Sequence, residues 1–191
     1  MPLRAALLLI LCLFVTPSAP VLADEQKDRA VEHVMILIDR AHRALQGRGN
    51  AAELRNAIDS AIAFNLWVAG FTKKHRDAFT PRQLLQFRAL LPGYLAQLYR
   101  KQFDMGLKQR PVLGKVRKVR RNVVVTTIFK RRNSRKLPIG WVVREIRGAP
   151  KIIDIVIGGV SFFRQKREEF RGIIKRRGAE GLLEYLRRNS L

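Results

Sequence analysis

Cysteine and acidic side chains are scarce in this 191-residue sequence, and each shortage narrows what the chain can do. The single cysteine, Cys12, lies within an N-terminal apolar run, so the rest of the chain forms no disulfide and carries out no thiol chemistry. Only 15 residues are Asp or Glu while 38 are Lys or Arg, which gives a formal net charge of +23. In a cytoplasmic protein this excess would indicate nucleic-acid binding first.

Motifs of catalysis and metal binding are missing as well. None of the three histidines, His33, His42 and His75, has a second ligand at the spacing of a zinc motif. The segment around Ser161 lacks the second glycine of a hydrolase nucleophile turn, and there is no glycine-rich phosphate loop. Asp154 stands alone in a β-branched run, where we expect it to have a structural role, such as accepting backbone N–H groups. The sequence thus predicts that the protein is not an enzyme and has no catalytic residue, metal or cofactor.

The N-terminus has the pattern of a signal peptide. Arg4 supplies the positive charge, and Ala5–Val15 is an apolar run of eleven residues, too short to cross a membrane. Val21-Leu22-Ala23 fits a cleavage site, so we expect residues 1–23 to be removed and residues 24–191 to form one exported, soluble domain in the periplasm. An uncleaved membrane anchor is the alternative.

Positive charge is concentrated in the second half of the chain. Residues 24–105 hold 13 basic and nine acidic residues, whereas residues 106–191 hold 24 basic and six acidic residues, a difference of +18. Because an exported protein meets little nucleic acid, we expect anionic membrane surfaces and acidic protein faces as partners. The basic loop with Arg131, Arg132, Arg135 and Lys136 is the candidate contact with such surfaces. Alternatively, the charge serves only solubility.

The first half of the chain has the periodicity of amphipathic helices. Apolar residues recur at helical spacing over residues 26–45, and Asn50 with Glu53 predicts a capped helix that runs to about Phe64. A short helix follows over residues 66–71. Thr80-Pro81-Arg82-Gln83 is typical of a helix start, and this helix is expected to extend to about Phe103 with a kink at Pro92.

The second half changes to strands joined by short turns. Strand-like runs occur around Val116–Val119 and at residues 123–129, 139–146 and 152–157, and short connections make them antiparallel. Gly158-Gly159 ends the last run, Ser161 can cap a helix, and Gly178 divides that helix in two. We therefore predict an α+β fold with N-terminal helices, an antiparallel sheet of about four strands, and two C-terminal helices across one face, with an apolar pocket between sheet and helices.

An ordered set of short motifs carries a resemblance to a known family. The motifs are Phe64-Asn65, Thr80-Pro81-Arg82-Gln83 followed by Phe87, Pro138-Ile139 with Trp141–Arg144, the run D-I-V-I-G-G-V-S from Asp154 to Ser161, Glu169-Phe170, and G-x-x-G-L-L from Gly178. Together they resemble the MlaC, or toluene-tolerance, family of periplasmic phospholipid-binding proteins over nearly the whole mature chain. The glutamate common before G-V-S is Gly158 here. A branch of the family is associated with hopanoid-lipid gene clusters, so the implied ligand is a phospholipid or a hopanoid-type lipid.

The resemblance implies a lipid shuttle between the inner and outer membranes. Its implied partners are an inner-membrane ABC lipid-transport complex and an outer-membrane lipoprotein, with no nucleic acid. Three apolar stripes are the predicted lipid-binding residues: Phe87, Leu91 and Tyr94 on the long helix, Phe129, Trp141 and Val143 on the strands, and Phe163, Phe170 and Ile174 on the closing helix. Periodicity does not distinguish a pocket from a dry core, so an exported basic protein that binds polyanions or anionic membranes without a pocket is the alternative. An exported hydrolase would need a catalytic triad, which the sequence does not offer.

Overall fold

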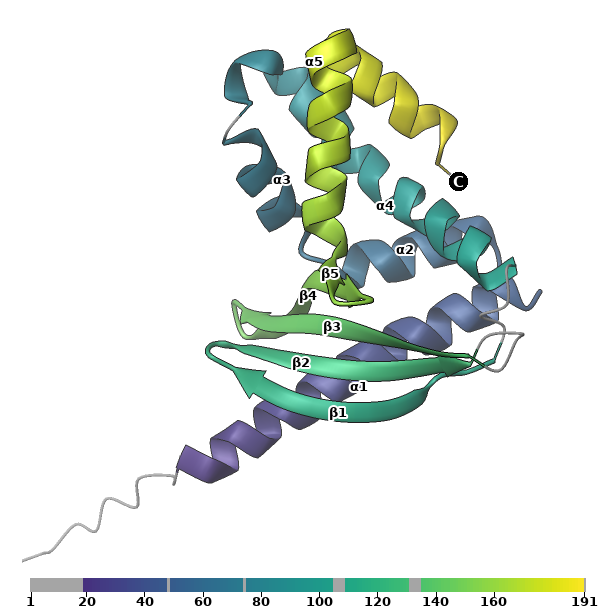
Figure 1. Ribbon diagram of the computed structural model, residues 1–191, viewed down its shortest axis with the longest axis vertical. Coiled ribbons are helices and arrows are strands. Elements are labelled where there is room, and N and C mark those ends of the chain that lie inside the picture. The colour runs from purple at the N-terminus through teal and green to yellow at the C-terminus, as the bar shows by residue number, and fades with distance from the viewer. Residues whose placement is uncertain (1–18, 48, 74, 105–108, 131–134, 191) are drawn as a thin grey trace, which may run out of the picture.

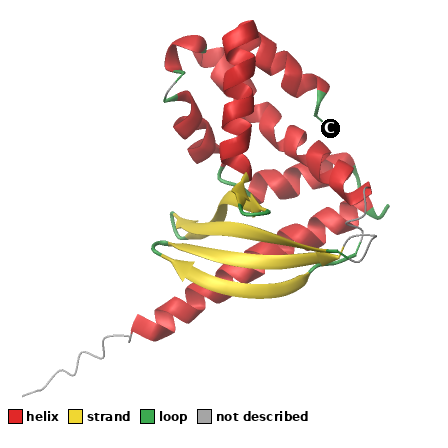
Figure 2. Cartoon of the chain, in the orientation of Figure 1, coloured by secondary structure: helices red, strands yellow, loops and turns green. Residues whose placement is uncertain are grey.

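The computed structural model describes residues 19–47, 49–73, 75–104, 109–130 and 135–190 (Figure 1). Its elements follow in the order α1 (Ala19–Leu45), α2 (Ala51–Ala61), α3 (Phe64–Thr72), η1 (Arg76–Ala78), α4 (Pro81–Asp104), β1 (Val112–Val119), β2 (Asn122–Lys130), β3 (Lys136–Ile146), β4 (Ala149–Ile157), β5 (Val160–Ser161) and α5 (Phe162–Arg188). Helices thus come first, the strands follow, and a helix closes the chain (Figure 2). The α+β fold predicted from the sequence is confirmed.

The five strands form one antiparallel sheet in the order β1-β2-β3-β4-β5, each strand pairing with the next along the chain. Side chains alternate along β2, where Val123, Val125, Thr127 and Phe129 are buried and the residues between them are only half-buried. The fifth strand adds to the four expected ones. It has two residues and follows the turn at Gly158 and Gly159, so it is too short to show a strand pattern in the sequence.

Helix α1 crosses the inner face of the sheet (Figure 1). Its apolar stripe, which includes Val34, Leu37, Ile38 and Ala41, is buried. The closing helices were expected to lie across the sheet instead. Helix α5 meets the sheet mainly at β4 and β5 and rises away from it beside α3 and α4. Helices α1 and α5 each have an apolar stripe, and such a stripe shows that a helix is packed on one side but not which element it packs against.

Local side-chain hydrogen bonds fix the helix ends where the sequence places them. The Asn50 side chain accepts a hydrogen bond of 3.0 Å from the Glu53 amide. Thr80 and Gln83 bond reciprocally: the Gln83 amide donates to Thr80 Oγ1 at 3.2 Å, and the Thr80 amide donates to Gln83 Oε1 at 3.0 Å. Ser161 accepts from the Arg164 amide at 3.1 Å and so caps α5. These three predicted starts are confirmed.

A cluster of aromatic rings holds α3, α4 and α5 together away from the sheet. Trp67 and Phe71 of α3 stack with centroids 5.8 Å apart. Phe87 of α4 lies 5.8 Å from Trp67, and Phe170 of α5 lies 6.1 Å from Phe87. These side chains are almost completely buried, so the cluster is a second packing centre beside the one between α1 and the sheet.

Within the described residues, no helix combines the length and the apolar character that a membrane crossing requires. Residues 1–18 lie outside the described part of the chain, and α1 begins at Ala19. The signal peptide and its cleavage after Ala23 stay a prediction.

Candidate functional site

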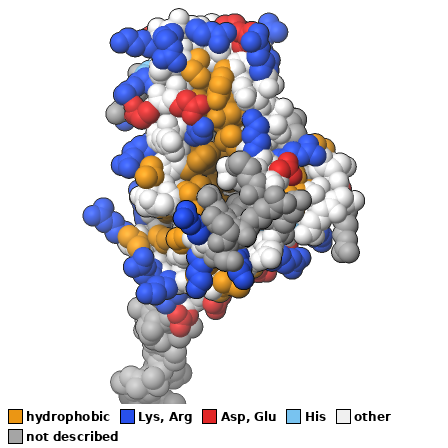
Figure 3. Space-filling view, turned by 45° about the vertical axis from the view of Figure 1, so that its right-hand side comes forward, with side chains coloured by type: hydrophobic (Ala, Val, Ile, Leu, Met, Phe, Trp, Pro, Cys, Tyr) orange, Lys and Arg blue, Asp and Glu red, His pale blue; other side chains and the backbone are white. Residues whose placement is uncertain are grey.

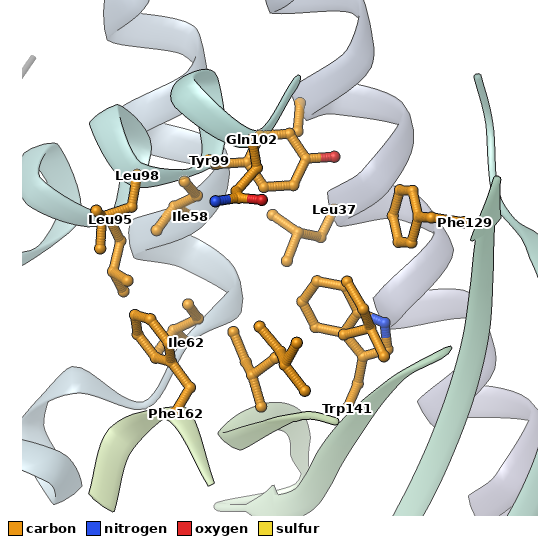
Figure 4. A pocket seen from close by; sticks show the side chains of 14 residues that line it. Leu37, Ile58, Ile62, Leu95, Leu98, Tyr99, Gln102, Phe129, Trp141 and Phe162 are labelled. Carbon is orange, nitrogen blue, oxygen red and sulfur yellow. The ribbon is translucent and has the colours of Figure 1, made fainter. Parts of the chain in front are cut away.

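A cavity of about 110 Å³ lies between the helices and the inner face of the sheet (Figure 4). Helices α1, α2 and α4, the first residue of α5 and three strands enclose it. The helical walls are Leu37, Ala41, Ile58, Leu95, Leu98, Tyr99, Gln102 and Phe162, with Ile62 just beyond α2. The sheet contributes Phe129, Ile139, Trp141, Ile155 and Ile157.

Regular spacing brings these side chains to one place. Residues 95, 98, 99 and 102 of α4 recur at helical spacing and share one face of the helix. On the sheet, residues two apart share a face, and cross-strand pairing aligns Ile139 with Ile157 and Trp141 with Ile155. The end of α2 is fixed to β4 because Ile62 forms a parallel bridge with Ile152 and the Ala63 amide donates to the Ile152 carbonyl at 2.9 Å. The cavity is therefore bounded by elements that are tied to one another.

The walls are almost entirely apolar. The indole Nε1 of Trp141 donates a 2.8 Å hydrogen bond to Thr127 Oγ1, so this polar group is satisfied inside the protein. Among the lining residues, Gln102 and Ile157 are exposed, so the cavity reaches the surface beside them. Tyr99 carries a buried hydroxyl that has no hydrogen-bond partner among the described residues. Burial raises the pKa of Tyr99 far above its ordinary value, so the hydroxyl stays protonated.

Asp154 organises the junction that brings Phe162 to the cavity. Its carboxylate accepts hydrogen bonds from the Ile155 amide at 2.8 Å, from the Ser161 hydroxyl at 2.5 Å and from the Phe163 amide at 3.3 Å. The three donors belong to β4, β5 and α5, so one side chain fixes the turn from the sheet into the last helix. The expected structural role of Asp154 is confirmed.

Of the nine predicted lipid-binding residues, two line this cavity: Phe129 and Trp141. Another four, Leu91, Tyr94, Phe163 and Phe170, surround a separate void of about 10 Å³ under the first turns of α5. Leu95 and Phe162 border both spaces, so they separate the cavity from the smaller void.

The other three predicted residues lie away from the cavity. Phe87 is inside the aromatic cluster, and Ile174 packs half-buried against the core. Val143 faces the same side of the sheet as Trp141, as its spacing predicts, but it lies under the N-terminal half of α1 beside Ala30. Strand β3 is 11 residues long and the cavity occupies one end of it, so sharing a face does not place both residues at the cavity.

Several lining residues are absent from the sequence-based set, chiefly the contributions of α1 and α2. Leu37, Ala41 and Ile58 belong to apolar stripes whose periodicity is typical of core helices. Tyr99 and Gln102 lie on the same face of α4 as Leu95 and Leu98. Their helical spacing was therefore the one signal in the sequence that could have placed them at the cavity.

The predicted contact with anionic surfaces falls partly outside the described residues, because Arg131 and Arg132 lie there. Arg135 and Lys136 are exposed, and Lys136 is the cross-strand partner of Lys130. Lys130 directly follows Phe129, which lines the cavity, so basic residues occur at this end of the sheet. Nowhere in the described ranges do three His, Cys, Asp or Glu side chains gather as a metal-binding group.

Comparison with known proteins agrees with this geometry. The family model of the MlaC protein matches residues 28–188. A solved structure of a phospholipid-binding protein from Ralstonia solanacearum, in complex with a phospholipid, superposes with a TM-score of 0.66 at 19% sequence identity, covering 84% of this chain and 96% of that chain. At this identity the likeness shows the shared fold, and no curated protein matches the chain in sequence. The chain belongs to the MlaC family of phospholipid-binding proteins, which are carriers and not enzymes.

Proposed function

We propose that this protein is a periplasmic shuttle that carries a lipid between the inner and outer membranes, with the hydrocarbon chains in the cavity between α4 and the sheet. The observation that carries the proposal is the cavity itself, whose walls are almost entirely apolar. The solved relative from Ralstonia solanacearum is a phospholipid complex, which favours a phospholipid as the ligand here. A hopanoid-type lipid is the second candidate.

A soluble carrier lowers the large energetic barrier to moving a lipid through water. Each methylene group that leaves a membrane for water costs about 0.8 kcal/mol, so a lipid with roughly 30 methylenes loses on the order of 20 kcal/mol. Spontaneous transfer through water is correspondingly slow. An apolar cavity in a soluble protein removes most of this cost, and release then requires a docking partner that opens or compresses the cavity.

The size of the cavity implies that its walls move when lipid enters. About 110 Å³ is less than the roughly 300–1,000 Å³ of pockets that hold drug-sized ligands. Rotation of Phe162 away from Leu95 would join the cavity to the smaller void beside it. In the proposed loaded state, Leu91, Tyr94, Phe163 and Phe170 therefore contact the lipid together with Phe129 and Trp141.

Family membership supports two protein partners, an inner-membrane ABC lipid-transport complex and an outer-membrane lipoprotein. We infer that the basic residues at the β2–β3 end of the sheet, including Arg135 and Lys136, face anionic membrane surfaces or acidic partner surfaces. The alternative function, polyanion binding without an internal lipid, gives no role to the apolar cavity.

The test places an arginine on α4 at the cavity in one variant and on the exposed side of α4 in another, and compares the lipid that the two variants bind. Leu98 is half-buried and lines the cavity, whereas Leu85 is 73% exposed. We expect Leu98→Arg to reduce the lipid bound to protein purified from cells at least tenfold, because an unpaired charge among hydrocarbon chains costs several kcal/mol. The introduced arginine side chain can extend toward the open side near Gln102, so the domain stays folded. Leu85→Arg should retain the parent's lipid.

Native mass spectrometry reports lipid occupancy, and circular dichroism reports folding on the same samples. A folded, lipid-poor Leu98→Arg variant beside a lipid-loaded parent and Leu85→Arg control supports the shuttle. A parent that carries no lipid, or a Leu98→Arg variant that is as fully loaded as the parent, contradicts it.

A further inference from the structure

Exposed hydrophobic side chains are concentrated at one end of the sheet. Of the eight large hydrophobic side chains that are exposed in the described part of the chain, four lie there: Val112 and Leu113 where β1 begins, Ile157 where β4 ends, and Val160 where β5 begins. Their exposed fractions are 63%, 48%, 38% and 48%. In Figure 1 strands β1 to β3 have this end on the right, the side on which α4 also ends. Single exposed hydrophobic residues are common, but a group at one place indicates a binding surface.

Strand pairing places these side chains in a row across the sheet. Val112 lies opposite Ile128 of β2, which lies opposite the exposed Pro138 of β3. Strand β3 pairs in turn with the end of β4, where Ile157 lies opposite Val160. The first three side chains project from the outer face of the sheet and Ile157 from the inner face, because alternate residues of a strand face opposite sides. A flat surface lying across this end would therefore meet apolar side chains from both faces.

The cavity reaches the surface at the same end. Ile157 lines the cavity and is also exposed, as is Gln102 of α4. Phe129 near the end of β2 and Ile139 near the start of β3 belong to the cavity wall as well. A lipid that enters or leaves beside Ile157 therefore passes the exposed apolar side chains.

Basic side chains border this end of the sheet. Lys130 of β2 and Lys136 of β3 are exposed and lie directly opposite each other in the strand pair. Like charges in this position repel each other, and an anionic surface relieves the repulsion. Exposed apolar side chains beside cations are typical of protein faces that bind anionic bilayers, where the cations contact head groups and the apolar side chains enter the hydrocarbon boundary. An acidic protein face would pair with the lysines, but it would bring no hydrocarbon to the cavity.

We propose that this end of the sheet inserts Val112, Leu113, Ile157 and Val160 into the surface of an anionic bilayer, so that lipid moves directly between the membrane and the cavity. This activity rests on the proposed carrier function and adds to it the exchange of lipid with a bare bilayer, without a protein partner. The hydrocarbon chains then pass from one apolar environment to another and avoid the cost of entering water.

The test compares valines at the two ends of the sheet. Val119 is 49% exposed at the other end of β1, so Val119→Asn is the matched control for Val112→Asn and Val160→Asn. All three variants keep the net charge. We expect Val112→Asn and Val160→Asn each to weaken binding to vesicles of phosphatidylglycerol and phosphatidylcholine about three- to tenfold, because each loses the burial of a half-exposed valine side chain. Val119→Asn should bind like the parent.

Vesicle co-sedimentation gives the affinities, and circular dichroism confirms folding. Transfer of a fluorescent phosphatidylglycerol from the vesicles to delipidated parent protein should proceed without any other protein. It should slow in Val112→Asn and Val160→Asn, but not in Val119→Asn.

A dye at the same positions reports insertion directly. In a Cys12→Ser background the sequence holds no other cysteine, so Val160→Cys and Val119→Cys each carry one environment-sensitive dye. When vesicles are added, emission from residue 160 should shift to the blue and be quenched by lipids that carry spin labels on their acyl chains. Emission from residue 119 should change in neither way.

Two results would overturn direct exchange with the bilayer: a dye at residue 160 that stays in water, or affinities of Val112→Asn and Val160→Asn equal to that of Val119→Asn. The apolar end of the sheet would then be left for a protein partner. Native mass spectrometry of the parent purified from cells tests the carrier function separately. A parent loaded with lipid whose dye stays in water keeps the carrier function and loses only the direct exchange, whereas a parent without lipid overturns the carrier function.

Discussion

The imidazole of His42 is almost completely enclosed by the fold. Its side chain is 1% exposed, it meets Phe103 edge to face at 5.3 Å, and neither ring nitrogen has a partner in the described part of the chain. Burial lowers the pKa of His42, the nearby charge of Arg110 lowers it further, and Asp39 acts in the opposite direction. The folded protein therefore holds this histidine neutral.

We expect this histidine to make the protein less stable in mild acid. In the unfolded chain it takes up a proton near its ordinary pKa of 6.5, but in the folded chain it does so only at lower pH. The free energy of unfolding is therefore unaffected by His42 above pH 6.5. It decreases as the pH falls from there toward the folded-state pKa, by at most about 1.4 kcal/mol per pH unit for one proton. Urea denaturation at several pH values between 7.5 and 5 measures this slope.

The His42→Leu variant should show a flatter decline over this range. Part of the decline remains, because burial also lowers the pKa of His33, with Lys151 assisting and the Ala61 carbonyl opposing. Parallel stability curves for parent and variant would show that His42 does not cause the acid sensitivity.

Single residues whose partners are close in sequence could be predicted, and those with distant partners could not. Asn50, Thr80 and Ser161 act on amides three residues ahead, so their roles are visible in the sequence. The position of Tyr99 in a cavity wall depends on α1 and the sheet as well as on its own helix. Its apolar neighbours on α4 indicate only that this face is buried.

At the scale of elements, α5 consists of two arms joined at Gly178. This residue has φ 65° and ψ −174°, a backbone conformation that is essentially restricted to glycine. The first arm places Phe163 and Phe170 against α3 and α4, and the second arm buries Leu182 and Leu186. The break therefore lets both arms of one continuous segment contact α4, the first through Phe170 and Phe87 and the second through Arg187 and Gln86.

Replacement of Gly178 by alanine should destabilise the protein by about 1–3 kcal/mol. A Cβ at this position would meet no atom within 4 Å, so the cost is backbone strain and not a clash. Gly172 in the first arm is the matched control, because it has regular helical geometry and an added Cβ would meet only the end of the Arg176 side chain at 3.4 Å.

Gly172→Ala should be neutral or stabilising by up to about 1 kcal/mol, since alanine favours the helix. Thermal and urea denaturation of both variants provide the comparison. Equal stability of the two variants would mean that the second arm can reorient at no cost.

The element boundaries were largely predictable, but the arrangement of the helices was not. Several element boundaries coincide with residues that mark a turn or a helix end in the sequence: Thr80, Gly158-Gly159 and Gly178. Which amphipathic helix covers the sheet is decided by tertiary packing, and α1 does so where the closing helices were expected. Helix α4 continues through Pro92 to Asp104, as its periodicity predicted, and the kink expected at Pro92 stays a prediction.

At the scale of the whole molecule, positive charge dominates the surface. Figure 3 shows Lys and Arg side chains on all sides of a band of hydrophobic side chains, with few acidic groups between them. The β1–β2 hairpin contributes an exposed basic set: Lys115, Arg117, Lys118, Arg120 and Arg121. These residues belong to the half of the chain with the +18 imbalance.

We expect the protein to bind anionic vesicles in a salt-dependent manner. Attraction between separated surface charges is screened over about 8 Å at physiological ionic strength, so binding should fall steeply between roughly 20 and 500 mM salt. Charge reversal at Arg131, Arg132, Arg135 and Lys136 should weaken binding, and zwitterionic vesicles serve as the control. Vesicle co-sedimentation measures the bound fraction. Binding that is independent of salt would assign the charge to solubility alone.

The apolar cavity lies between sheet and helices as predicted, but the identity of its lining residues is what the sequence predicted least well. Phe87 and Phe129 are equally buried aromatic residues in apolar stripes, yet Phe87 packs against Trp67 and Phe71 while Phe129 lines the cavity. The difference arises from how closely the separate helices and strands around each residue approach one another. Periodicity within one element contains no information about that distance.

The attachment of the α2–α3 corner to β4 also determines when the protein can fold. Ile62 and Ile152 pair directly, the Lys151 ammonium group donates to the Ser60 carbonyl, and Trp67 bonds to Phe163, 96 positions further along the chain. Contacts between such distant segments require a long loop to close and slow the folding of a domain. In a chain that emerges N-terminus first, α2 and α3 can pack on α1 and α4, but their contacts with β4 and α5 form only when the last fifth arrives. Its helical half therefore stays without a completed core throughout synthesis or export, and folding is completed after the whole chain is available.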